Sequence, residues 1–151
     1  WDKNHLSDEV LADRIAELIA SEEGARGFFA ISLSGDWPLM DRLPEPIIFQ
    51  LRRSDKFVVE LTVKNLVMSS AMSIEHRRNK DLEYLAGSER ITQRCIELLK
   101  VLEPNKVKIY LESFLNGLTG KGNYVSFFNR WKYDNEQRIA ITKSINAVAE
   151  N

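Results

Sequence analysis

The hydrophobic and polar positions at the start of the chain predict one helix followed by β-structure. Ser7 is a good helix N-cap, Asp8 and Glu9 suit the positive end of a helix dipole, and apolar residues then recur at helical spacing. Gly24 is expected to end this helix in a left-handed conformation. Residues 27–35 form a short run that is rich in β-formers and bounded by glycines, which predicts a strand.

Two further short strands are predicted in the next part of the chain. Residues 47–53 alternate loosely between apolar and polar side chains, which is typical of a half-buried strand. Residues 56–63 contain Phe57 and several β-branched side chains, which favour a third strand. A helix that begins at Ser54 is the alternative, because periodicity alone does not separate strand from helix over such a short run.

From residue 64 onward the pattern is helical. A broken apolar stripe ends at Gly87, and Ser88 is expected to cap the clearest helix of the chain. Pro104 should end that helix, because proline cannot continue a helix interior, and the same apolar spacing then repeats in a following helix. The middle of the chain is therefore expected to consist of amphipathic helices that lie on a common core.

The last part of the chain predicts a glycine-rich turn and two helices. The turn covers residues 117–122, a helix covers 123–132, and Asp134 with Gln137 three residues later forms a capping box for the final helix. Taken together, the elements predict a single α+β domain over residues 1–151. In it, a small N-terminal β-sheet of two or three short strands packs against four or five α-helices.

Composition supports one folded domain and gives no bulk preference for a polyanion. The chain has 151 residues, of which 44% are hydrophobic and 28% charged, values typical of globular domains. Lys and Arg (21) nearly balance Asp and Glu (22), so the net charge of −1 provides no overall attraction to nucleic acid or anionic membranes. The balance hides an acidic first half and a basic second half. Residues 104–133 contain five basic side chains and one carboxylate, Glu112.

The cysteine and hydropathy patterns predict a soluble, cytoplasmic protein. A single cysteine, Cys95, excludes an internal disulfide and gives no sign of an oxidising compartment. The chain contains no uninterrupted run of about 18 apolar residues, so we expect no membrane span and no membrane partner. The polar, acidic N-terminal segment does not resemble a secretory signal.

The residue patterns required for common catalytic and metal sites are missing from the sequence. His5 and His76 are far apart and show no metal-ligand spacing, so we expect no metal. The segment 31–35 lacks the first glycine of a nucleophile elbow, and Cys95 falls on an apolar helical stripe. In the glycine-rich turn, Lys121 is followed by glycine, and so the phosphate-loop consensus fails. We expect no cofactor and no catalytic centre, although an enzyme that uses carboxylate, Lys or Tyr groups from distant segments stays an open alternative.

The most unusual segment is 124–133, in which aromatic and basic side chains alternate. Such a segment can pack into a core, anchor a protein interface, or stack on single-stranded bases. The loop around Trp37 is similarly apolar and could join the same surface. The candidate binding residues are Lys121, Tyr124, Phe127, Arg130, Trp131, Lys132 and Trp37.

These observations predict a non-catalytic protein-interaction domain that acts as an adaptor, regulator or assembly factor. Its partner would be another protein or a second copy of the chain, because an exposed aromatic stripe also suits a homodimer face. The alternative is a binding module for nucleic acid or a phosphorylated ligand that uses Lys121, Arg130 and Lys132. A sequence pI near 6.2 makes nucleic acid the less favoured partner.

Overall fold

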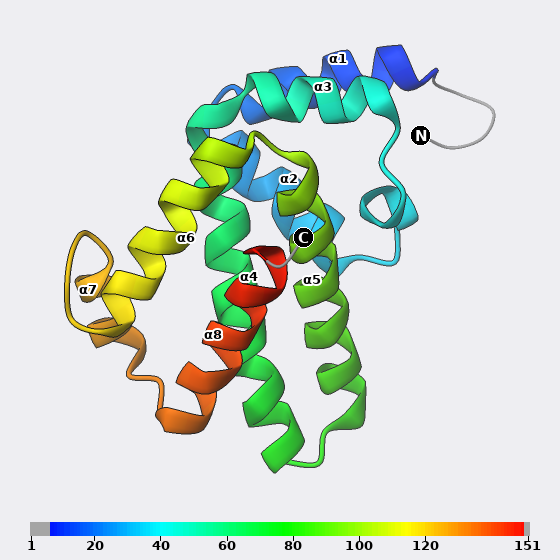
Figure 1. The fold of residues 1–151 in the computed structure, drawn as a ribbon. Helices are drawn as coiled ribbons and strands as arrows, with labels where there is room; N and C mark the ends of the chain where they lie inside the picture. The colour runs from blue at the N-terminus through cyan, green and yellow to red at the C-terminus, as the bar shows by residue number, and fades with distance from the viewer. Residues whose placement is uncertain (1–6, 150–151) are drawn as a thin grey trace.

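The computed structural model describes residues 7–149, apart from the side chains of residues 55 and 56, and all regular elements in this part are helical (Figure 1). They are α1 (Asp8–Ile19), α2 (Glu22–Ser34), the 3-10 helix η1 (Pro38–Asp41), α3 (Glu45–Arg53), α4 (Asp55–Arg78), α5 (Leu82–Val101), α6 (Pro104–Leu118), α7 (Val125–Trp131) and α8 (Asn135–Ala149). Residues 7–149 contain no strand, so the predicted α+β fold with an N-terminal sheet is wrong.

Helix α2 takes the place of the first predicted strand. Ser21 caps it by accepting a hydrogen bond from the backbone N–H of Gly24 at 3.0 Å. Gly24 therefore begins a helix and does not end one, and a Cβ there would lie 1.9 Å from the carbonyl oxygen of Leu18. A helical glycine costs only about 1 kcal/mol relative to alanine, which the burial of two phenylalanines outweighs. The buried residues of α2 follow helical spacing: Ala25, Phe28, Phe29, Ser32 and Leu33.

Helices α3 and α4 replace the second and third predicted strands. In α3 the buried side chains are those of Ile47, Ile48 and Leu51, which lie on one helical face. The alternative of a helix beginning at Ser54 is the correct one for the next segment. The β-branched residues that favoured a strand are fully or almost fully buried within α4, and tertiary burial overrides their weak intrinsic preference.

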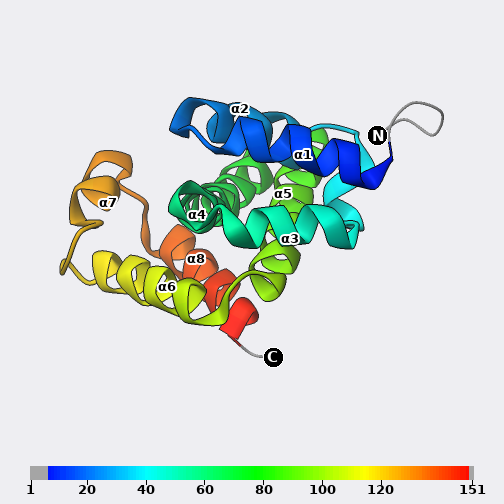
Figure 2. The ribbon, with the colours of Figure 1, turned by 90° about the horizontal axis from the view of Figure 1, so that it is seen from above.

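Helix α4 is the central element of the fold. It contacts α2, α3, α5, α6 and α8, and Figure 2 shows it between α1 and α2 on one side and α6 and α8 on the other. Residues 57–78 are long and apolar enough to cross a membrane by length and composition alone. Of its most apolar window, 67% is buried inside the structure, so its position in the core accounts for its hydropathy.

The apolar stripe that was predicted to end at Gly87 is divided between two helices, since α4 ends at Arg78 and α5 begins at Leu82. Asp81 caps α5 by accepting a hydrogen bond from the backbone N–H of Tyr84 at 3.3 Å. Gly87 and Ser88 lie inside α5, and Ser88 is buried, so the predicted stop and cap there are wrong. Since neither residue forbids a helix, the apolar stripe on both sides of them continues through one helix.

The remaining boundaries agree with the sequence prediction. Pro104 separates α5 from α6 and occupies the first turn of α6, where its missing N–H costs nothing. The capping box at α8 is confirmed, because the Asp134 N–H donates to Gln137 Oε1 at 3.0 Å and the Gln137 N–H donates to Asp134 Oδ1 at 2.9 Å. The predicted helix at 123–132 is present as the shorter α7.

Candidate functional site

The glycine-rich turn folds α7 back against α6. Gly120 and Gly122 have φ angles of 84° and 81°, values that residues other than glycine rarely adopt. A Cβ on Gly117 would lie 3.0 Å from the ring of Phe128, so glycine permits α7 to pack closely on α6. At the other end of α7, Lys132 adopts a left-handed conformation (φ 52°) and its N–H donates to the Phe128 carbonyl at 2.9 Å. The backbone of this segment is therefore fixed at both ends.

An aromatic cluster holds α7 in place. The ring of Phe114, which is fully buried, stacks on Tyr124 at a centroid distance of 3.8 Å and meets Phe127 and Phe128 edge-on. The Tyr124 hydroxyl donates to a carboxylate oxygen of Glu60 at 2.5 Å. Burial raises the pKa of Tyr124, and the adjacent Glu60 carboxylate raises it further. Tyr124 and Phe127 are half-buried and attach α7 to the protein, whereas Phe128 is buried.

Trp131 is the aromatic residue of α7 that faces solvent. Its side chain is 43% exposed, and its ring lies parallel to that of Tyr133 at a centroid distance of 6.4 Å. The guanidinium of Arg130 lies over the Trp131 ring, 5.7 Å from its centroid. Partial burial raises the pKa of Tyr133 to about 12. The indole therefore lies against two neighbouring side chains and is still accessible.

Three exposed cations lie in α7 and in the segments that flank it. Lys121, Arg130 and Lys132 are exposed, and none of them forms an ion pair with another residue in the described part of the chain. The neighbouring carboxylates of Asp134 and Glu136 are engaged by Arg78 at 2.7 and 2.6 Å. The hydrogen bond from Arg78 lowers the pKa of Asp134. We call the set Lys121, Arg130, Trp131, Lys132 and Tyr133 the aromatic–basic surface.

Trp37 does not join this surface. It lies at the start of η1, and Figures 1 and 2 place η1 and α7 on opposite sides of the molecule. Trp37 is half-buried and packs against the core. Its carbonyl oxygen accepts a hydrogen bond at 3.5 Å from Arg94, a side chain of α5 that is 3% exposed. Trp37 therefore belongs to the packed body of the protein.

Arg94 closes the end of α2 with one buried guanidinium group. It donates to the carbonyl oxygens of Ser32, Leu33 and Gly35 at 2.8 to 3.2 Å. It also donates to both carboxylate oxygens of Asp41 at 2.8 and 3.0 Å. This hydrogen bonding lowers the pKa of Asp41. Arg94 therefore bonds to the last turn of α2, to the backbone that follows it and to the Asp41 side chain of η1, and the last carbonyls of an α-helix have no partners within the helix itself.

The other candidate residues from the sequence do not gather into a site. Cys95 is buried, and burial raises the pKa of its thiol. His76 stacks on Tyr84 at a centroid distance of 5.5 Å near the end of α4. His5 lies outside the described residues. Within the described part of the chain, no three His, Cys, Asp or Glu side chains are placed to hold a metal ion.

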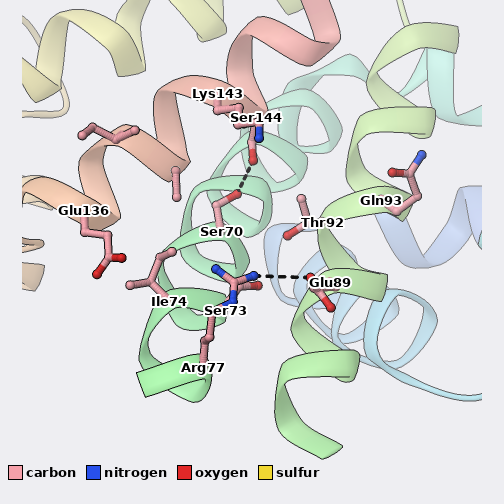
Figure 3. A pocket seen from close by; sticks show the side chains of 12 residues that line it. Ser70, Ser73, Ile74, Arg77, Glu89, Thr92, Gln93, Glu136, Lys143 and Ser144 are labelled. Atoms are coloured by element: carbon pink, nitrogen blue, oxygen red, sulfur yellow. Dashed lines mark hydrogen bonds and ion pairs between the residues drawn. The ribbon is translucent and has the colours of Figure 1, made fainter. Parts of the chain in front are cut away.

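A groove between α4, α5 and α8 could not be predicted from the sequence. It has a volume of about 450 Å³, and Figure 3 shows side chains from all three helices around it. Its lining includes the hydroxyl groups of Ser70, Thr92 and Ser144 and the charged groups of Arg77, Glu89 and Lys143. The serines among the buried positions of α4 were the available signal, because polar residues are unusual at buried helical positions.

Comparisons with known proteins identify the family of the chain. No curated protein and no solved structure matches the chain significantly. One family model covers residues 1–148, which is nearly the full length. The chain therefore belongs to the family described as uncharacterised conserved protein UCP020893.

Proposed function

We propose that this protein is an interaction domain that binds an acidic segment of a protein partner through the aromatic–basic surface. The observation that carries the proposal is the state of Trp131, which is 43% exposed and yet lies against Tyr133 and Arg130. An exposed indole costs hydration free energy unless a partner covers it. Trp, Tyr and Arg are the residues most enriched among interface hot spots, and all three occur here together.

The rigidity of the segment supports binding without a large entropic cost. Phe114 and Phe128 anchor α7 to α6, and the left-handed Lys132 fixes the direction in which the chain leaves α7. A surface that is already ordered loses little conformational freedom when it binds. A folded partner or a short peptide could therefore dock on α7 without reorganising it.

The charge of the surface selects the chemistry of the partner. Lys121, Arg130 and Lys132 lack ion-pair partners among the described residues, so a carboxylate from a partner would meet no internal competitor. Rim charges of this kind accelerate association and exclude basic partners more than they add affinity. Phosphates of nucleic acid would meet the same three cations, but the net charge of −1 opposes general polyanion binding.

A peptide-display selection tests the proposal. Peptides selected on the wild-type protein should combine Asp or Glu residues with an apolar anchor. Their affinity should fall at least about tenfold for Trp131→Ala and for the double variant Arg130→Glu/Lys132→Glu. The matched control is Arg14→Glu/Arg42→Glu, which reverses two exposed charges on α1 and after η1 and should leave the affinity unchanged.

Two outcomes would contradict the proposal. Selected peptides that bind the wild type and the α7 double variant equally would show that another surface is used. A single-stranded oligonucleotide that binds at low salt, weakens steeply as salt rises, and depends on the same cations would replace the protein partner with nucleic acid.

A further inference from the structure

We propose that the groove between α4, α5 and α8 is a second binding site, which takes a metabolite-sized oxyanion that also carries hydroxyl groups. This site is separate from the aromatic–basic surface, with which it shares no residue. Its volume of about 450 Å³ lies within the range of small-molecule pockets. The three helices that form it are long core elements, so its walls are fixed by the packing of the fold.

One end of the groove suits an oxyanion. Figure 3 shows Lys143 and Ser144 of α8 together at this end, above Ser70 of α4. The single hydroxyl proton of Ser70 faces two acceptors at 2.7 Å, the carbonyl oxygen of Leu66 and Oγ of Ser144, so both serine hydroxyls are already hydrogen-bonded within the protein. Lys143 is exposed and forms no ion pair with a residue in the described part of the chain. The ammonium group of Lys143 is a suitable partner for phosphate or carboxylate oxygens.

The other end of the groove suits hydroxyl groups. Arg77 and Glu89 form an ion pair there at 3.7 Å, and their side chains are 59% and 57% exposed. Such a long, exposed pair is weak, and it presents a donor and an acceptor side by side to a ligand. A sugar-like hydroxyl can donate to Glu89 and accept from Arg77, which a purely anionic ligand cannot do.

The carboxylates of the groove fix the orientation of the ligand. Glu136 begins α8, about two helical turns before Lys143, and its carboxylate is engaged by Arg78 at 2.6 Å. Glu89 lies beside Arg77 at the opposite end from Lys143 (Figure 3). A second negative charge near either glutamate would be repelled, so the oxyanion is expected at the Lys143 end only.

Three related probes test this site. Glycerol 3-phosphate, glycerate and glycerol share a hydroxylated skeleton and differ in the charged group, so we would follow backbone amide NMR shifts during titration with each. Glycerol 3-phosphate, glycerate or both should give saturable shifts around Ser70, Thr92 and Ser144 at concentrations up to about 10 mM, and glycerol should not. The comparison of the two charged probes shows whether phosphate or carboxylate is preferred.

Two variants and one control locate the binding. Lys143→Ala should weaken binding about tenfold or more, because it removes the charge-assisted contact. Ala140→Leu fills the groove with a good helix former and should abolish the shifts without unfolding the protein, as checked by circular dichroism. Lys121→Ala is the matched control, since it removes an exposed lysine of the aromatic–basic surface and should leave the binding of the charged probe unchanged.

The proposal is overturned if neither charged probe gives saturable shifts, or if glycerol binds equally well. It is also overturned if Ala140→Leu binds like the wild type, or if Lys121→Ala and Lys143→Ala weaken binding equally. None of these results affects peptide binding by the aromatic–basic surface, so the two proposals fail separately.

Discussion

The Trp37 loop (residues 35–41) and α7 both combine a tryptophan with a neighbouring arginine, yet the two arginines differ in burial and in the partners that they bind. In the Trp37 loop the arginine is Arg94, which is 3% exposed and bonded to backbone carbonyls and to Asp41. In α7 the arginine is Arg130, which is exposed and lies over Trp131. Trp37 is therefore packed into the body of the protein, whereas Trp131 is exposed to solvent.

This difference shows which apolar segment is available to a partner. Arg94 forms hydrogen bonds with the polar groups of the Trp37 loop. Few polar groups of this loop therefore remain available to a partner. The α7 segment is anchored to α6 by its aromatic residues, while Lys121, Arg130 and Lys132 remain without ion-pair partners among the described residues. Aromatic content alone does not identify a binding surface, because the partners of the adjacent charges decide its role.

The largest expected effect is on the Trp37 loop. Arg94→Met keeps much of the side-chain volume but removes every hydrogen bond to the end of α2 and to η1. We expect a loss of about 4 kcal/mol in the free energy of unfolding, measured by urea denaturation. The control is Arg90→Met, one turn earlier on α5, which removes an exposed side chain with weaker contacts and should cost less than about 1 kcal/mol. Similar losses in the two variants would show that Arg94 does not fasten the loop.

The next effect concerns the anchor of α7. Phe128→Ala removes a ring that is 2% exposed and packs against Phe114 and Phe127. We expect a loss of about 3 kcal/mol in the free energy of unfolding together with reduced peptide binding, because the aromatic–basic surface loses its support. Trp131→Ala should reduce peptide binding while costing less than about 1 kcal/mol in stability. If Trp131→Ala destabilises as much as Phe128→Ala, Trp131 belongs to the core.

The smallest effect is the acid sensitivity of the Trp37 loop. Hydrogen bonding by Arg94 holds the pKa of Asp41 below its ordinary value of 3.8. The folded protein therefore binds fewer protons at Asp41 than the unfolded chain does. The ionised Asp41 carboxylate thus contributes to the free energy of unfolding in full above its ordinary pKa, and this stabilisation is lost as the pH falls through the lower pKa of the folded protein. Below about pH 4 the stability of the wild type should fall more steeply than that of Asp41→Asn. Parallel curves for the two proteins would contradict this linkage.

The sequence predicted the capped helices α1 and α8, but it assigned strands to the short apolar runs of α2 and α3 and to the start of α4, which is buried on several sides. The Ser7 cap and the Asp134–Gln137 box are local hydrogen bonds, so they can be recognised from residue types alone. The β-branched run of α4 lies in the centre of the fold, where burial on several sides removes the one-sided pattern that identifies a helix. Gly24 serves a close approach to Leu18, which only the tertiary structure reveals.

The candidate site was partly predictable for a similar reason. The aromatic and basic residues of α7 are adjacent in sequence, so composition could single them out, but it could not separate the buried Phe128 from the exposed Trp131. Trp37 was grouped with them because its distance from α7 depends on the topology. The groove between α4, α5 and α8 joins residues more than 70 positions apart, such as Ser70 and Ser144, and no local pattern connects them.

A charge-swap experiment tests the central claim, that the aromatic–basic surface binds an acidic protein segment, most directly. A peptide selected on the wild type would be measured against Arg130→Glu/Lys132→Glu, alongside a second peptide in which its acidic residues are changed to lysine. The account predicts that the acidic peptide loses at least about tenfold in affinity for the variant and that the lysine peptide regains it. Equal binding of the acidic peptide to both proteins, or a lysine peptide that fails to bind the variant, would contradict the claim.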